Sequence, residues 1–353
     1  MRAQVDGALE ARHSALALDI DLEKAIESRA EFLTPPHRGA FRLFDGFRES
    51  VGEVTPLVLE IYGDTLVAFD YRRAPDDDPK PVEAIMARLQ EKLPFLRTGI
   101  LKQKRADDPE VRRGHLILGE AVQVSRRIEE NGIRYALDLL SHHDATFFLD
   151  TRNLRAFLQA ESKGKRVLNA FAYSCSLGVA AQAGGARQVL HTDKNRGVLN
   201  LGKDSYSLNG LPIRRADFVA GDFFDVAARL RKTGELFDTV VIDPPFFADG
   251  GGGRVDLVSS VAALLDKARP LVGHEGLLVV VVNALFIPGS AVMSELEKMV
   301  ADGYATIERT IEVPADCAPA LAAGRSLPAD PAPFNHPTKI AMVRLRRKDG
   351  KRA

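Results

Sequence analysis

Hydrophobic residues in the second half of the chain form short Val- and Leu-rich runs, separated by segments of helical periodicity about 10–15 residues long. Continuous apolar runs that alternate with helices indicate parallel strands buried on both faces. The pattern therefore predicts a doubly wound, Rossmann-like α/β sheet. The predicted parallel strands are RVLNAF, QVLHTD, ADFVAGD, FDTVVID and GLLVVVVNALF.

Two further strands, ATIERTIEV and TKIAMVRLR, follow near the end of the chain, divided by a Pro- and Ala-rich loop at 314–337. They predict an antiparallel C-terminal edge on the sheet. Ahead of the first parallel strand, IRYALDLL and TFFLD also have the composition of strands.

The first part of the chain has a different rhythm. Helical patterns at 22–32 and 82–92 mix with the strand-like runs PLVLEIYG, LVAFDY and GHLILG. We therefore expect a small N-terminal α+β domain over residues 1–125, with a possible role in substrate recognition, and a second domain over residues 126–353.

Composition describes an ordinary globular protein, with 45% hydrophobic and 27% charged residues among 353. No apolar run reaches the roughly 18 residues that a membrane span needs, and acids in the N-terminal segment argue against a targeting peptide. A cytoplasmic protein with no membrane partner is the resulting expectation. Two cysteines, Cys175 and Cys317, exclude a disulfide framework and a Cys-His metal cluster, so no metal is expected.

Net charge is zero, whereas a nucleic-acid-binding protein is more often basic. Two basic runs remain, LKQKR at 101–105 and RLRRKDGKRA at the C-terminus. Each is interpreted as a solvated face or frayed tail, or alternatively as a contact with RNA.

Polar residues end the predicted parallel strands. Asp193, Asp222 and Asp243 each close a strand, and the first strand runs into NAFAYSCSLG, residues 169–178. A single acid in such a place is typical of a helix N-cap, as for Asp193 and Asp222. Four polar strand ends together indicate a ligand site, because ligands of open α/β sheets bind outside the carboxyl ends of the strands.

The first strand-to-helix turn lacks the G-x-G-x-x-G pattern that a pyrophosphate requires. A nucleoside cofactor without phosphates, S-adenosyl-L-methionine, suits it better. Asp193 would hold the ribose hydroxyls. Asp222 would accept from the adenine amino group, between Phe223 and the stem of Lys194. The methionine end would be bound by the segment 169–174, including Asn169, Phe171, Tyr173 and Ser174.

The stretch Asp243-Pro244-Pro245-Phe246 is similar to the [ND]-P-P-[FYW] pattern of class I methyltransferases that act on planar nitrogen-bearing groups. Prolines fix φ and remove N–H donors, so the carbonyl groups beside Pro244 are preset acceptors. The Asp243 carboxylate would hold a base edge and Phe246 would stack on the base. Glycines 250–253 would form a mobile lid. The alternatives are a simple strand-terminating turn and a plain flexible loop.

The chain resembles the bacterial 23S ribosomal RNA methyltransferases over roughly residues 55–345. The resemblance rests on IYGDTLVAF, on the segment IEENGIRYALDLLSHHDATFFLDTRNLR, on KRVLNAFAYSCSLGVAAQAGGARQVLHTDKN and on GELFDTVVIDPPFF. It implies the class I S-adenosylmethionine-dependent methyltransferase fold for residues 126–353. It also implies that Thr151 and Arg152 lie near the methionine end of the cofactor.

Two departures from that family bear on the substrate. The first 50 residues are too few for the RNA-binding PUA domain of its cytosine-C5 members. After VVVVN the chain reads Ala284-Leu285-Phe286, without the nucleophilic Cys that carbon-5 methylation requires. The chain is closer to the guanine-N7 branch, which has Asn at the position of Asn283.

The sequence therefore predicts a methyltransferase that acts on a base, guanine N7 or another nitrogen, of large-subunit ribosomal RNA. Methylation of a protein side chain or a small molecule is one alternative, and a non-catalytic RNA-binding module of the same fold is another. A nicotinamide oxidoreductase is disfavoured by the missing glycine pattern. The oligomeric state is left open.

Overall fold

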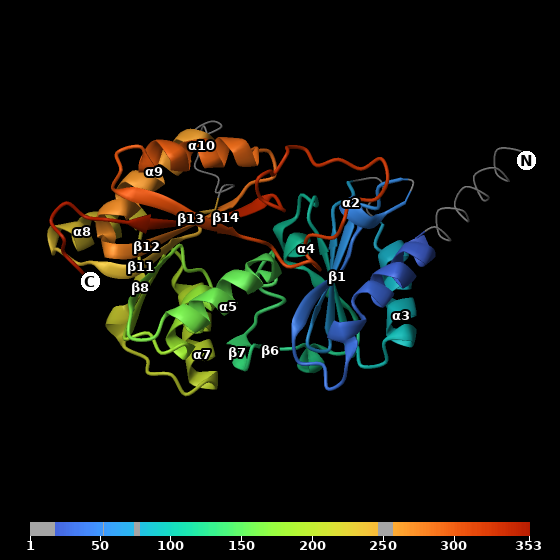
Figure 1. Ribbon diagram of the computed structural model, residues 1–353. Helices are drawn as coiled ribbons and strands as arrows, with labels where there is room; N and C mark the ends of the chain where they lie inside the picture. Colours follow the sequence, from blue (N-terminus) through green and yellow to red (C-terminus); the bar gives the residue numbers. More distant parts are fainter. Residues whose placement is uncertain (1–17, 52, 74–77, 246–256) are drawn as a thin grey trace, which may run out of the picture. The chain divides into compact units, whose positions relative to one another are not determined.

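The computed structural model describes residues 18–51, 53–73, 78–245 and 257–353. They form two compact units (Figure 1). The first unit contains the chain up to Glu130 together with Leu137–Leu149 and Ala315–Ser326; the second contains Asn131–Ala136, Asp150–Pro314 and Leu327–Ala353. Two segments beyond the predicted boundary at residue 125 thus belong to the first unit, because the chain returns to it after each excursion.

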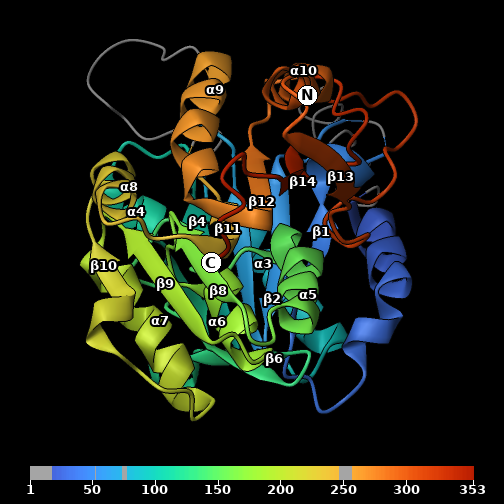
Figure 2. The ribbon, with the colours of Figure 1, turned by 60° about the vertical axis from the view of Figure 1, so that its left-hand side comes forward.

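The second unit is built on a seven-stranded sheet in the order β10-β9-β8-β11-β12-β14-β13 (Figure 2). Neighbouring strands from β10 to β12 are parallel, whereas β14 is antiparallel to both β12 and β13. The predicted doubly wound sheet with an antiparallel C-terminal edge is therefore confirmed. The strands are β8 (Arg166–Ala170), β9 (Gln188–Asp193), β10 (Phe218–Ala220), β11 (Phe237–Ile242), β12 (Val272–Asn283), β13 (Ala305–Ile311) and β14 (Thr338–Leu345).

Helices cover both faces of this sheet, as the continuous apolar runs require. Val240 and Ile242 face one core cluster, which receives α8, α9 and α10, while Val241 between them faces the opposite cluster with α5 and α6. The helix α7 packs beside α6. The helices are α5 (Arg152–Glu161), α6 (Ser176–Ala183), α7 (Arg196–Leu208), α8 (Phe223–Lys232), α9 (Leu257–Ala268) and α10 (Gly289–Val300).

The first unit is a five-stranded sheet in the order β1-β2-β3-β4-β5 with helices beside it, which confirms the predicted α+β domain. Its core joins the sheet to α3 and to the helical residues 18–28. Its elements are β1 (Ala40–Asp45), α2 (Gly46–Glu49), β2 (Leu57–Tyr62), β3 (Thr65–Asp70), α3 (Lys80–Lys92), β4 (Thr98–Gln103), α4 (Pro109–Arg113), β5 (His115–Leu118) and β6 (Arg127–Glu130), with β7 (Ile133–Ala136) following in the second unit.

Two expectations for this half of the chain need correction. The basic run LKQKR is a solvated face only in part, since Arg105 is exposed and Lys104 is half-buried. Lys102 of β4 is buried and donates from Nζ to the carbonyl oxygen of His142 at 2.7 Å. TFFLD is not a strand. Thr146 has a left-handed φ of 57°, and its N–H donates to Asp144 Oδ1 at 2.8 Å in an Asx turn, so the chain bends before it can extend.

Short 3-10 helices complete the described structure: η1 (Ala30–Leu33), η2 (Ala121–Gln123), η3 (Leu149–Thr151), η4 (Arg215–Asp217) and η5 (Arg269–Leu271). Among the helices of the described residues, none has both the length and the hydropathy that crossing a membrane requires.

Candidate functional site

The carboxyl ends of the parallel strands lie side by side at one edge of the second unit's sheet. The Ala172 N–H after β8 donates to the carbonyl oxygen of Thr192 at 2.9 Å. The Gly221 N–H after β10 donates to the carbonyl oxygen of Asp193, again at 2.9 Å. These hydrogen bonds thus bring residues 20 or more positions apart in the sequence together at one edge of the sheet. Since β8 and β11 are neighbours where the order of strands reverses, this is the switch point at which such sheets bind ligands.

The turn after β8 is held in an unusual backbone conformation. Phe171, Tyr173 and Cys175 have left-handed φ values of 56°, 47° and 65°. Each such non-glycine residue costs on the order of 1–3 kcal/mol and persists only where its surroundings enforce it. The Tyr173 N–H donates to Asp193 Oδ2 at 2.9 Å, and Ser174 is buried. The turn is therefore a rigid loop shaped without glycine.

Helices α6 and α7 approach this turn so closely that two glycines are required behind it. A Cβ on Gly178 of α6 would lie 2.2 Å from the Cε1 atom of His191. A Cβ on Gly202 of α7 would lie 2.4 Å from Cys175 Sγ. Both distances are far below contact, so a larger residue would displace His191 of β9 at the first place and Cys175 of the turn at the second.

Asp193 is anchored by backbone donors and keeps capacity for a ligand. Its Oδ2 accepts from Tyr173, and its Oδ1 accepts from the Asn195 N–H at 2.8 Å. The N-cap of α7 is Asn195, whose side chain accepts from the Gly197 N–H at 2.8 Å, so the capping role considered for Asp193 belongs to Asn195. A carboxylate has about four acceptor positions. Two thus remain on Asp193, which is partly exposed.

Asp222 does cap a helix, since it accepts from the Phe224 N–H at 2.8 Å at the start of α8. It also pairs with Lys194 Nζ at 2.8 Å, and this contact lowers the pKa of the Asp222 carboxyl. Because the Lys194 side chain is 74% exposed, the pair is weak and a ligand could replace it.

The phenylalanines after Asp222 divide their roles. Phe223 is buried, and its ring centroid lies 4.9 Å from that of Phe171. Phe224 is 43% exposed and contacts the Phe223 ring edge-on at 5.6 Å. The exposed ring beside Asp222 is therefore Phe224, a candidate that the sequence reasoning missed. The doublet Phe-Phe after the strand end was the signal.

Two buried polar atoms lie beneath these strand ends without a partner. Asn169 of β8 is 1% exposed and its Nδ2 lies 3.3 Å from His191 Nδ1, but its Oδ1 has no hydrogen-bond partner among the described residues. The same holds for Thr192 Oγ1 on β9. Unsatisfied buried polar atoms are rare and point to a missing partner. Together with carboxylates at two strand ends and a neutral turn, they fit a nucleoside cofactor that carries no phosphate.

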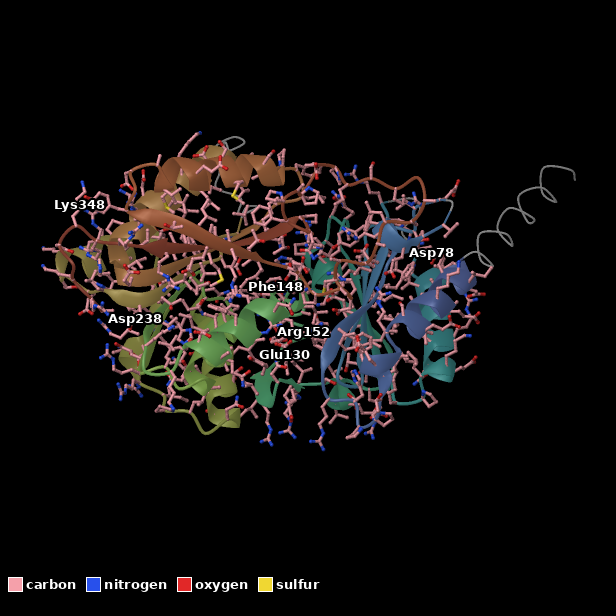
Figure 3. The ribbon with its side chains drawn as sticks, viewed as in Figure 1. Asp78, Glu130, Phe148, Arg152, Asp238 and Lys348 are labelled. Carbon is pink, nitrogen blue, oxygen red and sulfur yellow. The ribbon has the colours of Figure 1, made fainter. Side chains whose placement is uncertain are left out.

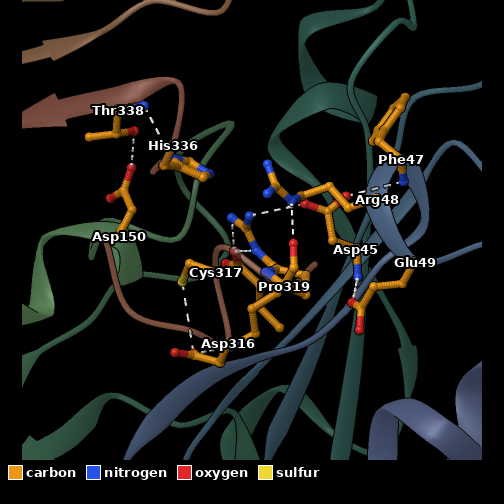
Figure 4. A network of polar contacts seen from close by, with 12 residues as sticks. Asp45, Phe47, Arg48, Glu49, Asp150, Asp316, Cys317, Pro319, His336 and Thr338 are labelled. Atoms are coloured by element: carbon orange, nitrogen blue, oxygen red, sulfur yellow. Dashed lines mark hydrogen bonds and ion pairs between the residues drawn. The ribbon is translucent and has the colours of Figure 1, made fainter. Parts of the chain in front are cut away.

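Asp243 directly follows β11 and precedes the buried Pro244. Burial and the nearby Asp150 carboxylate raise the pKa of the Asp243 carboxyl to about 7. Asp150 is itself buried, and Asp150 Oδ2 accepts from Thr338 Oγ1 at 2.6 Å (Figure 4). The side chain that would stack on a base, Phe246, and glycines 250–253 lie outside the described residues.

The start of α5 supplies the remaining predicted residues. Thr151 is buried and its Oγ1 accepts from Arg155 Nη1 at 2.8 Å, while Arg152 is the first, partly buried residue of the helix. Arg155 is 1% exposed, with its guanidinium 5.9 Å from the centre of the Tyr135 ring. Arg155 was not predicted, although it ends the TRNLR motif. It fixes Thr151.

A second unpredicted residue, Lys339 at the start of β14, is also buried. Its Nζ donates to the carbonyl oxygens of Ala284 at 2.8 Å and Pro337 at 2.7 Å, and burial lowers the pKa of Lys339 to about 8. Lys339 thereby links Ala284, just beyond the carboxyl end of β12, to the beginning of the neighbouring strand β14.

Neither cysteine offers an accessible thiolate. Cys175 and Cys317 are both buried and free, and burial raises the pKa of the Cys175 thiol well above its usual range. In the described part of the chain, no group of three or more His, Cys, Asp or Glu side chains could hold a metal ion.

A switch-point site with a glycine-free rigid turn and acids at successive strand ends defines a class I methyltransferase fold. The family of S-adenosylmethionine-dependent methyltransferases matches residues 100–325, and the chain belongs to it. Its cofactor is S-adenosyl-L-methionine, as the strand ends predicted.

Individual proteins support the same assignment. The chain is 39% identical over 137 residues to ribosomal RNA large subunit methyltransferase I of Photobacterium profundum, covering 39% of this chain and 34% of that protein. Identity to the enzyme of the same name from Tolumonas auensis is 34% over 203 residues, which cover 57% of this chain and 50% of the other. The chain thus spans a third to a half of these curated relatives.

Among solved structures, a methyltransferase complexed with SAH is similar, with a TM-score of 0.78 and 22% identity. The similarity covers 92% of this chain and 80% of the other. This similarity confirms the fold of the chain.

His191 beneath the cofactor turn makes stability depend on pH. The ring is fully buried, its Nε2 lies 2.8 Å from the Tyr206 hydroxyl, and burial lowers its pKa to about 3. In the unfolded chain a histidine has a pKa of about 6.5. Below that value only the unfolded state takes up the proton, so the stability that neutral His191 allows is lost as pH falls from 6.5 toward 3. Between pH 7 and 4.5 the loss is about 2.5 kcal/mol.

The test compares urea unfolding of the wild type and of His191→Gln, which cannot ionise. We expect the stability advantage of the wild type over this variant to shrink by about 2.5 kcal/mol between pH 7 and 4.5. Exposed His115→Gln is the control and should show no such change. A constant difference between wild type and His191→Gln over this range would contradict the prediction. The comparison is needed because the pKa of Asp243 is raised in the folded state. Protonation of Asp243 therefore stabilises the protein as pH falls, which opposes the effect of His191.

Proposed function

We propose that this protein transfers a methyl group from S-adenosyl-L-methionine to a nitrogen of a base in large-subunit ribosomal RNA, in the cytoplasm. The observation that carries the proposal is the placement of the half-buried Asp243 and the buried Pro244 directly after β11, the strand beside the cofactor turn of β8. The similarity to the ribosomal RNA large subunit methyltransferases I of Photobacterium profundum and Tolumonas auensis supports the choice of RNA.

When bound, the cofactor would supply an activated methyl group, which would pass in line from its sulfur to the attacking nitrogen, with S-adenosylhomocysteine as the leaving group. This chain's residues would bind and orient the reactants, which supplies much of the rate in such a reaction. Asp193 would accept from the ribose hydroxyls, and Asp222 from the adenine amino group beside Phe223, Phe224 and Lys194. The residues proposed at the methionine end are Asn169, Phe171, Tyr173, Ser174, Thr151 and Arg152. All of them lie at the end of β8, in the rigid turn that follows it, or at the start of α5.

Asp243 would accept a hydrogen bond from the base edge, Pro244 would keep the adjoining carbonyl groups in place, and Phe246 would stack on the base. A nitrogen target is favoured over carbon 5 of a pyrimidine. Carbon-5 transfer needs a thiolate that adds to the ring, whereas Cys175 is buried with a raised pKa and Cys317 is buried as well. Guanine N7 is the specific atom we propose, since it is nucleophilic without a covalent step.

The test is methyl transfer from labelled S-adenosyl-L-methionine to total RNA from cells that lack this protein, with and without ribonuclease. We expect label in the large-subunit RNA, sensitive to ribonuclease, and mapping of the modified base to give N7-methylguanine. Label on carbon 5 of a pyrimidine would overturn the assignment of a nitrogen target but not the assignment of RNA as the acceptor.

Ribonuclease also separates the two alternatives. Label that survives ribonuclease and is lost with protease, or that enters only small molecules, would replace RNA with another acceptor. RNA binding without transfer to free RNA or to ribosomal particles would indicate a non-catalytic module of the same fold.

A further inference from the structure

The basic C-terminal run is a folded element of the second unit, contrary to the frayed tail considered from the sequence. The Arg347 N–H donates to His274 Nδ1 at 3.0 Å, and Arg347 Nη1 donates to the carbonyl oxygen of Pro270 at 3.0 Å. The His274 N–H in turn donates to the carbonyl oxygen of Lys351 at 2.6 Å. The run is therefore fixed against the start of β12.

This arrangement borders an open pocket of about 350 Å³. Its apolar part comes from Pro270, Val272 and Leu345, and Tyr304 adds an aromatic wall. The charged lining residues are Arg269, Arg346, Arg347, Lys348, Asp302 and Asp349. Four cations thus face two acids around one opening.

Two of the cations are already neutralised and two are not. Arg269 pairs with Asp302 at 2.6 Å, and Arg347 pairs with Asp349 at 2.8 Å. Arg346 and Lys348 are exposed and have no carboxylate within ion-pair distance among the described residues.

Lys348 is instead placed over an aromatic ring. Its Nζ lies 4.7 Å from the centre of the Tyr304 ring, which orients the ammonium group beside the pocket. Lys351 and Arg352 continue the exposed positive charge along the same segment. The Lys348 charge also contributes to the lowered pKa of the Asp302 carboxyl, after the Tyr304 N–H and Arg269. The pocket therefore has four cations against two acids, and further exposed cations follow along the chain.

We propose that this pocket binds a phosphate of the RNA backbone, with Arg346 and Lys348 as its donors. The inference rests on the proposed function, and adds a second contact with the same RNA. Arginine and lysine are the usual phosphate ligands of proteins. The acceptor is a polymer and not a free anion, since four exposed cations at 346, 348, 351 and 352 exceed the needs of one phosphate.

The pocket is remote from the cofactor turn within the same unit. It is built at Val272, where β12 begins and pairs with Phe237, whereas Asn283 ends that strand eleven residues later, past an irregularity in the pairing with β11. Counted along the paired strands, from Phe237 to Ile242 and then from Val280 to Asn283, the two ends are roughly 26 Å apart at about 3.3 Å per residue. Figure 3 labels Lys348 at one end of the second unit and Arg152, at the start of α5, toward the other. A ligand here cannot touch the reacting atoms, so the pocket contributes affinity for a long substrate and not chemistry.

The test is the double variant Arg346→Ala/Lys348→Ala in the full chain, with Lys163→Ala/Arg187→Ala as a control that removes the same two kinds of exposed charge elsewhere in the second unit. Binding of large-subunit ribosomal RNA is measured over a series of salt concentrations. We expect the affinity of the double variant to fall roughly tenfold and the slope of log K against log salt to decrease by about one for each cation removed. Cofactor affinity and the rate of transfer at saturating RNA should not change.

The outcomes separate the two proposals. If the wild type binds and methylates RNA while the double variant keeps the wild-type affinity and salt slope, the phosphate pocket is refuted and the proposed function stands. If both double variants lose the same affinity, the effect is one of net charge and the pocket is again refuted. If the wild type binds no RNA, the proposed function and the pocket fall together.

Discussion

Replacement of Asp243 by alanine is expected to lower the rate of methyl transfer by about 10²- to 10⁴-fold, while S-adenosyl-L-methionine binds with nearly unchanged affinity. Asp243 directly follows β11 and precedes the buried Pro244. Our assignment places the Asp243 carboxyl group against the acceptor base and not against the cofactor. Transfer is measured with labelled cofactor and RNA, and cofactor affinity by calorimetric titration. An active Asp243→Ala variant would remove Asp243 from the mechanism.

The pH dependence of the wild type belongs to the same prediction. Because burial and Asp150 raise the pKa of Asp243 to about 7, the carboxylate that accepts from the base is present above that pH and lost below it. Activity should therefore rise through pH 7 and level off. Asp243→Asn keeps an acceptor oxygen but does not titrate, so its residual activity should lack this limb. Asp150→Asn removes the neighbouring negative charge and should shift the limb to lower pH. A profile that is unaltered in Asp243→Asn would assign the limb to another group.

The sheet and its ligand edge were predictable because their determinants are local. Each parallel strand is a short Val- or Leu-rich run between helical segments, and side chains such as Val240 and Val241 face opposite helical layers, as the absence of alternation implied. Since the carboxyl ends of parallel neighbours share one edge, the sequence alone was enough to assign Asp193, Asp222 and Asp243 to that edge.

What the sequence did not reveal depends on contacts between distant residues. Lysine is usually a surface residue, yet Lys102 and Lys339 are both buried. Carbonyl groups from distant segments accept hydrogen bonds from their ammonium groups and make this burial possible. The coupling of Asp150 to Asp243 joins residues more than 90 positions apart. The left-handed turn at Phe171, Tyr173 and Cys175 contains no glycine to signal it. Its conformation is enforced by Asp193 and by helices packed behind it.

That enforced turn underlies the second large effect, which we expect for Asp193→Ala. The variant should bind S-adenosyl-L-methionine about 10- to 100-fold more weakly. Hydrogen bonds to a charged group contribute about 1.5–3 kcal/mol, and the substitution removes the acceptor proposed for the ribose. It also removes the acceptor for the Tyr173 N–H, at 2.9 Å, so the strained turn loses one of its anchors. Calorimetric titration with the cofactor gives the dissociation constants.

Two further variants divide these contributions. Asp193→Asn retains an oxygen that can accept from Tyr173 but loses the charge, so an affinity between those of the wild type and Asp193→Ala indicates that both the anchor and the charge matter. Asp225→Ala removes an exposed acid one turn into α8, beside the same edge of the sheet, and should bind the cofactor as the wild type does. If Asp193→Ala binds as tightly as Asp225→Ala, Asp193 has no part in holding the ribose. If Asp193→Asn binds as weakly as Asp193→Ala, the negative charge accounts for the whole effect and the backbone anchor for none, because the anchor alone survives in the asparagine variant.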